Sequence, residues 1–141
     1  MSALIEQTLA HYAEHHGDPY ETAFAKLYAA DPNYQALFFL DADEGLRRNM
    51  MRTTLEIITT YIDNAYAAEN LVIGARLIHM TYEVTDDFDL FFQITRDVIA
   101  EGCADIWTQD HAKAWNAMLK DFEKARVWAI NNLIKTTGKK R

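Results

Sequence analysis

Apolar residues recur at intervals of three and four along most of the chain, whereas the strict alternation of a half-buried strand is nearly absent. This spacing gathers the apolar side chains on one face of each helix and leaves polar side chains on the other. The pattern predicts an all-α domain of seven or eight helices of unequal length.

Glycine, proline and clusters of short polar residues divide this helical pattern. The first helix lies within residues 1–16. A long helix is predicted for 46–63, with one stripe of residues expected to be buried. That stripe contains Met50, Thr54, Ile57, Ile58, Tyr61 and Ile62. The predicted breaks are Gly17, Asp31-Pro32, 41–45, the segment after Met80 and Gly102, and the basic residues 135–141 form a tail expected to be flexible.

Residues with capping chemistry stand where three of the helices should begin. Asp18 can accept backbone N–H groups at the start of the second helix, and Pro19 suits the first helical position because its missing N–H needs no partner. Thr85 and Thr108 fit the same role before the Phe-rich helix and the last helix. The last helix should run to Leu133, with Trp115 among its packing residues.

The composition narrows the class of protein. A chain of 141 residues that is 50% apolar fits a single domain, residues 1–141, with a substantial core. Its formal charge of −7 works against a nucleic-acid or anionic-membrane surface. We find one cysteine, no secretory leader and no apolar run near the roughly 20 residues of a membrane span, so we expect a cytoplasmic protein without nucleic-acid or membrane partners.

Few residues suggest chemistry. The common signatures of acyl transfer, phosphoryl transfer and zinc hydrolysis are missing from the sequence. His11 and His15 have metal-ligand spacing, but no further ligands accompany them, so a solvated helix face explains them better. His79 stands out because it lies late on a mostly apolar helix and is followed by a Phe-rich helix.

Three segments resemble the globin family, in particular bacterial single-domain globins and the globin domain of flavohaemoglobins. The segment 24–38, with Pro32 and Phe38 at the family's separation, is similar to the passage from the second helix to the haem-contacting phenylalanine. The residues from His79 to Phe88 resemble the proximal-histidine segment, and 105–115 resembles the opening of the last globin helix. The resemblance covers roughly 20–122 and implies a globin fold of seven to eight helices around a haem pocket.

The resemblance implies a role for several single residues. His79 is the expected proximal ligand of the iron of haem b, and Phe38 is expected to pack on the haem face. Phe24 lies where many bacterial globins place a tyrosine, and it has no hydroxyl to offer a bound gas. Met50 or, as the second choice, Asn49 faces the ligand, with Thr54 one turn later. The remaining expected haem contacts are Val84, Phe88 and Phe91 on the proximal side.

The function implied by this resemblance is reversible binding of oxygen, nitric oxide or carbon monoxide at the iron. An apolar distal pocket lacks an acid–base group, so minor nitric oxide dioxygenase or peroxidase activity, with an external reductase as electron donor, is the weaker expectation. Two alternatives stay open. One is a haem-free globin-like regulatory or interaction domain, and the other is a redox haem protein ligated by His79 and Met50.

Overall fold

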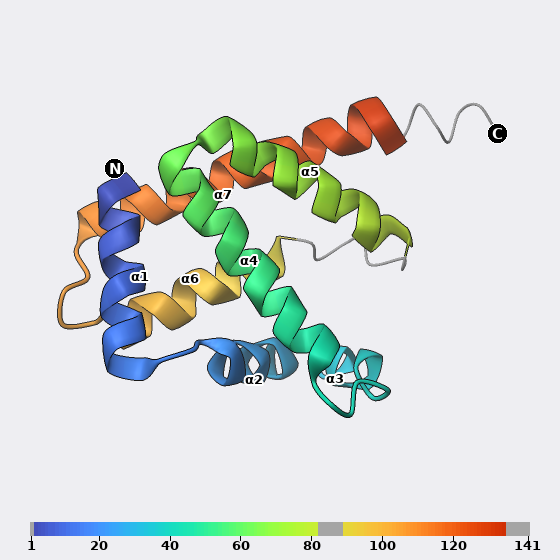
Figure 1. The fold of residues 1–141 in the computed structure, drawn as a ribbon, viewed down its shortest axis with the longest axis horizontal. Helices are drawn as coiled ribbons and strands as arrows, with labels where there is room; N and C mark the ends of the chain where they lie inside the picture. The colour runs from blue at the N-terminus through green and yellow to red at the C-terminus, as the bar shows by residue number, and fades with distance from the viewer. Residues whose placement is uncertain (1, 82–88, 135–141) are drawn as a thin grey trace.

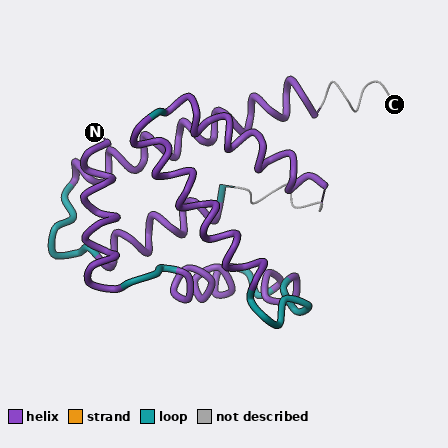
Figure 2. The backbone as a smooth tube through the Cα atoms, viewed as in Figure 1, coloured by secondary structure: helices purple, strands orange, loops and turns teal. Residues whose placement is uncertain are grey.

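The computed structural model describes residues 2–81 and 89–134, and within these ranges the chain forms helices joined by short turns (Figures 1 and 2). The expected all-α class is therefore confirmed for the described part of the chain. Among the described residues, no helix combines the length and apolarity needed to cross a membrane. The helices are α1 (Ser2–His16), α2 (Tyr20–Ala30), α3 (Asn33–Leu37), α4 (Gly45–Asp63), α5 (Ala65–Thr81), α6 (Leu90–Gly102) and α7 (Gln109–Ala129), which continues into the π-helical turn η1 (Ile130–Ile134).

Helices distant in sequence pack together. α1 contacts α4, α6 and α7, while α2 packs along α6 and α5 packs along α7 (Figure 1). α4 crosses the front of the molecule in Figure 1 and leads through a short turn into α5. The core lies where these helices meet, so each helix buries one face and exposes the other.

The crossing of α1 and α7 contains a fully buried polar contact. Trp115 is 0% exposed, and its indole Nε1–H donates to Thr8 Oγ1 at 3.0 Å. The Thr8 hydroxyl in turn donates to the carbonyl of Ile5 at 2.8 Å, so both polar groups are satisfied away from water. Trp115 is thus a packing residue, as its position in the sequence suggested.

Two of the predicted caps lie in the described ranges. Thr108 is the N-cap of α7 as predicted, whereas Pro19, expected at the first helical position, is itself the N-cap of α2 and Asp18 precedes it. Asp18 Oδ1 accepts the backbone N–H of Tyr20 at 2.9 Å. Thr108 forms a capping box with His111, in which the histidine ring takes the place usually filled by Glu or Gln. The third predicted cap, Thr85, lies outside the described residues, and α6 begins at Leu90 directly after Asp89.

The buried face of α4 differs in part from the predicted one. Met51, left out of the expected stripe, is 2% exposed, so the buried face of α4 is wider than the predicted stripe. On α5 the buried ridge is Ala68, Val72 and Arg76, spaced by four residues, whereas Leu71 is 40% exposed. The last helix also differs, since the α-helix ends at Ala129 and a π-helical turn follows.

Replacing Thr8 by valine should lower the free energy of unfolding by about 1–3 kcal/mol, because the buried Trp115 N–H loses its acceptor. Urea denaturation followed by circular dichroism measures the change. Thr59→Val is the matched control, since Thr59 also donates to the carbonyl three residues earlier but is exposed. Equal stabilities of the two variants would contradict this assignment.

Candidate functional site

Three phenylalanines from separate elements meet between α2, α3 and α6, and we call them the aromatic cluster. The ring centroids of Phe24 and Phe91 are 5.1 Å apart, and those of Phe24 and Phe38 are 5.6 Å apart in an edge-to-face arrangement. Phe24 and Phe91 are buried, whereas Phe38 is only partly buried. The structure thus brings together three residues that the sequence assigned to one site.

The local sequence explains how the cluster is positioned. Tyr20, Phe24 and Tyr28 are spaced by four residues and form one ridge of α2, with neighbouring ring centroids 5.2 and 6.0 Å apart. Pro32 precedes the five residues of α3, and Phe38 follows them. The carbonyl of Phe38 accepts the backbone N–H of Asp41 at 2.9 Å, so a tight turn holds Phe38 beside α2.

Asp41 and Arg47 connect this turn to the start of α4. The carboxylate of Asp41 accepts the backbone N–H groups of Leu46 and Arg47 at 2.9 and 3.0 Å and the Arg47 Nε–H at 3.0 Å. Arg47 also donates to the Asp41 carbonyl at 2.7 Å and to the Tyr28 hydroxyl at 3.4 Å. Burial raises the pKa of Asp41, but these donors outweigh it, so the net pKa lies below the ordinary value.

The two candidate distal residues have different surroundings. Asn49 is exposed, and its amide oxygen accepts a hydrogen bond from Arg52. Met50 is partly buried and packs against the core. Thr54 is 6% exposed, and its hydroxyl donates to the Met50 carbonyl at 2.9 Å. Because this hydroxyl is bonded to the backbone, the face of α4 with Met50 and Thr54 presents mainly apolar side-chain atoms.

The structure describes the candidate proximal haem contacts only in part. The backbone of His79 belongs to α5, but its side chain lies outside the described residues, as do Val84 and Phe88. One turn before His79, Arg76 is 4% exposed. Asp89, at the start of α6, accepts from Arg126 Nε at 2.8 Å and so ties α6 to α7. Burial raises the pKa of the Asp89 carboxyl, although Arg126 opposes this effect.

The other histidines make local hydrogen bonds. His11 Nε2 lies 3.0 Å from Asp105 Oδ1, and the His15 ring donates from Nδ1 to the carbonyl of His11 at 2.9 Å. Among the side chains that the structure describes, no three His, Cys, Asp or Glu are grouped in a way that could hold a metal ion. His11 is partly buried and paired with Asp105, whereas His15 is exposed.

His111 is a polar core residue that the sequence analysis missed. It is 5% exposed, accepts the Thr108 backbone N–H on Nδ1 at 3.0 Å, and lies 2.7 Å from Gln7 Oε1 through Nε2. Since Nδ1 accepts, Nε2 carries the proton and donates to Gln7. The sequence did contain a signal for this role, because His111 lies three residues after the predicted cap Thr108 and a capping box pairs these two positions.

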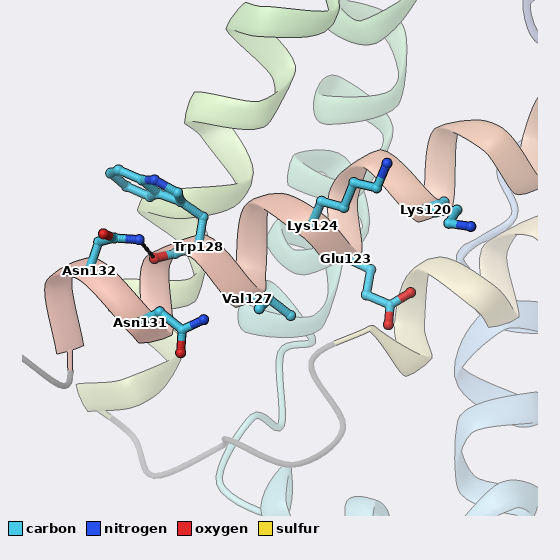
Figure 3. A pocket seen from close by; sticks show the side chains of 7 residues that line it. All are labelled: Lys120, Glu123, Lys124, Val127, Trp128, Asn131 and Asn132. Carbon is cyan, nitrogen blue, oxygen red and sulfur yellow. Dashed lines mark hydrogen bonds between the residues drawn. The ribbon is translucent and has the colours of Figure 1, made fainter.

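Two open hollows lie along α7, away from the aromatic cluster. One of about 360 Å³ lies on its exposed face between charged, apolar and amide side chains, including Lys124, Val127 and Trp128 (Figure 3). The other, of about 340 Å³, lies between α6 and α7 near Asp89 and Arg96. Neither contains a residue that the sequence assigned to the haem site.

The described residues form a helical protein with an aromatic cluster between α2, α3 and α6. No protein-family model, curated protein or solved structure matches the chain.

Replacing Asp41 by asparagine should lower the free energy of unfolding at pH 7, and the loss should shrink as the pH falls below about 4. The folded-state pKa of Asp41 is lowered, so its ionised form stabilises the fold above the unfolded pKa, and that stabilisation is lost as the pH falls through the folded pKa.

Urea denaturation between neutral and acidic pH measures this effect. Asp63→Asn is the control, because Asp63 is exposed at the other end of α4. A pH-independent difference in stability between D41N and the wild-type protein would show that the charge of the Asp41 carboxylate does not stabilise the start of α4.

Proposed function

We propose that this protein is a globin that holds haem b through His79 and reversibly binds a diatomic gas. The supporting observation is the order of elements around the aromatic cluster. The chain runs from α2, which carries Phe24, through short α3 to Phe38. Long α4 and then α5, which includes His79, follow in the order that the resemblance implies. The contact of Phe24, Phe38 and Phe91 supports the same assignment.

The residues available suit a haem better than a bare metal ion. Haem needs one axial nitrogen and apolar surroundings, whereas a bare ion needs three or four ligating side chains. The described residues hold no such group of ligands, while Phe38, Met50 and the buried Thr54 offer largely apolar surface near the α2–α3–α4 corner. Haem iron, when bound, supplies a position at which a diatomic gas binds reversibly.

Each residue has a separate task in this proposal. His79 binds the iron through a neutral imidazole nitrogen, and Phe38 packs on the ring of the haem. Phe24 limits the distal space without donating a hydrogen bond, and Met50 contributes apolar surface. Because Asn49 is exposed and bonded to Arg52, Met50 is the better candidate for the ligand-facing position.

The same residues favour gas binding over catalysis. Efficient peroxide cleavage needs a distal group that moves a proton between the two oxygen atoms. Phe24, Met50 and Thr54 supply no group that titrates near neutral pH. Nitric oxide oxidation would in addition need electrons from an external reductase.

A haem-free interaction domain is the second candidate, and one observation favours it. Phe24 and Phe91 are both buried and in direct contact, so the space between α2 and α6 is already closed. In that case the aromatic cluster is ordinary core, and function resides on the surface of the helices.

Replacing His79 by alanine should abolish stoichiometric haem binding. Haem titration followed by absorbance measures it, with spectra of the oxidised, reduced and carbon monoxide-treated forms. His15→Ala is the control, because His15 is exposed on α1. This variant should bind haem like the wild-type protein. Full binding by H79A would refute the axial assignment, and no binding by the wild-type protein would favour the haem-free alternative.

The reduced spectrum also separates the gas-binding protein from the His79/Met50 alternative. An open distal position gives a high-spin ferrous spectrum, whereas methionine ligation gives a low-spin six-coordinate one. Met50→Leu keeps the apolar volume and removes the sulfur, so a low-spin spectrum caused by Met50 should become high-spin in this variant.

Replacing Phe24 by tyrosine should slow oxygen dissociation from the reduced protein several-fold, because a hydroxyl at this position can donate to bound oxygen. Stopped-flow measurement of oxygen release tests the change. Tyr12→Phe, which removes a hydroxyl from a buried side chain of α1, is the comparison for general effects on the core. An unchanged dissociation rate in F24Y would show that Phe24 does not overhang the ligand.

A further inference from the structure

His111 is the most deeply buried histidine among the side chains that the structure describes. It is 5% exposed, whereas His11 is partly buried and His15 and His16 are exposed. Histidine is the residue whose ordinary pKa, about 6.5, lies closest to physiological pH. A buried histidine therefore makes the packing around it depend on pH when its hydrogen bonds are possible in only one protonation state.

The hydrogen bonds of His111 need the neutral ring, and we call these bonds the His111 contact. The backbone N–H of Thr108 donates to Nδ1 at 3.0 Å, so Nδ1 is unprotonated. Nε2 carries the proton and donates to Gln7 Oε1 at 2.7 Å. The contact therefore joins the first turn of α7 both to its own cap and to α1.

Protonation of the ring breaks one of these bonds. An imidazolium carries an N–H on each nitrogen and can accept no hydrogen bond. Its Nδ1 can then donate only to Thr108 Oγ1, which lies 2.8 Å away, and the backbone N–H of Thr108 loses its acceptor. The capping box at the start of α7 is lost at the same time, because it depends on that N–H.

The residues around the ring offer little compensation for a positive charge. No ion pair among the described residues includes His111, and its partners Gln7 and Thr108 are uncharged. The titratable residues beside these partners are Glu6 and His11 on α1, Asp105 in the turn, and Asp110 and Lys113 on α7. Asp105 is bonded to His11, and the other three charged side chains are exposed to water, which screens them.

One neighbour favours the charged ring, but only weakly. The Trp107 ring stacks on the His111 ring with the centroids 5.8 Å apart, near the limit of about 6 Å for a cation–π contact. Burial acts in the opposite direction, because a charge removed from water loses its hydration. Together with the broken bond to Thr108, burial outweighs this attraction.

The His111 contact holds α1 beside a second, fully buried contact. Gln7 accepts from His111, and the next residue, Thr8, accepts from Trp115 Nε1 at 3.0 Å. The Thr8 carbonyl also accepts from Cys103 Sγ at 3.2 Å, and Cys103 is 0% exposed. Loss of the His111 contact therefore loosens the part of α1 that bonds the buried thiol.

We propose that His111 is a pH-sensitive switch, which joins α1 to the start of α7 when the ring is neutral and releases this part of α1 when the ring is protonated. Above about pH 7 the imidazole is neutral in the folded and the unfolded chain, so the contact is complete. As the pH falls through about 6.5, the unfolded chain gains a proton that the folded ring gains only by losing a bond, so stability falls. The switch does not depend on haem.

The first test compares His111→Gln with the wild-type protein. Glutamine here keeps a capping box with Thr108, because Gln and Glu are the usual partners of the cap, and it does not titrate. Urea denaturation at about pH 8 and about pH 5 gives the folding constant of each protein. Relative to H111Q, the wild-type folding constant should fall several-fold on acidification, up to the limit of about 30-fold for one proton.

His16→Gln is the matched control. His16 Nε2 donates to the Gly102 carbonyl at 2.9 Å, which both protonation states allow, and the side chain is exposed. Relative to H16Q, the wild-type protein should therefore keep or gain stability as the pH falls.

A second test follows the release of α1 without denaturant. Cys103 is the single cysteine of the chain, so its rate of labelling by dithiodipyridine reports local opening when it is divided by the rate in the urea-unfolded chain at the same pH. In the wild-type protein this ratio should rise several-fold between about pH 8 and about pH 5. Gln7→Ala removes the exposed acceptor on α1, so its ratio should already be raised at about pH 8.

Three results would each overturn the proposal. They are stabilities of the wild-type protein and H111Q that change in parallel with pH, a wild-type labelling ratio that is the same at both pH values, and a Q7A labelling ratio equal to that of the wild-type protein. If H111Q does not fold, the two labelling results decide, because neither needs that variant.

Discussion

The hydrogen bond from Trp115 Nε1 to Thr8 Oγ1 fixes the crossing of the first and last helices, and the other helices depend on this crossing. Both groups are fully buried, so only a register that brings them together avoids an unsatisfied polar group in the core. Because α1 also contacts α4 and α6, its position on α7 determines where those helices pack. A directional polar contact thus selects one arrangement among many that would bury similar apolar area.

At the other end of the molecule, a second polar connection sets the geometry of the candidate site. Asp41 accepts backbone and guanidinium donors from the first turn of α4, and Arg47 reaches back to the Tyr28 hydroxyl on α2. The turn that carries Phe38 is held between these two helices. The aromatic cluster is therefore supported by charges around it as well as by contacts among its rings.

The interior of the molecule carries the proposed function. Phe24, Phe38 and Phe91 meet between α2, α3 and α6, and their contacts support the proposal of a haem protein. The large exposed apolar side chains lie elsewhere, since Trp128 is on α7 and Phe39 and Leu40 follow α3.

The sequence by itself determined the helical class, most helix boundaries and the cap at Thr108, because periodicity and capping are local properties of the chain. It also grouped Phe24, Phe38 and Phe91, through a resemblance to a known family. Only the tertiary structure decided that Met51 is buried, that Leu71 is exposed and that His111 joins Gln7 across α1 and α7. A helix that packs on two neighbours buries a wider face than its own period indicates, and partners distant in sequence leave no local signal.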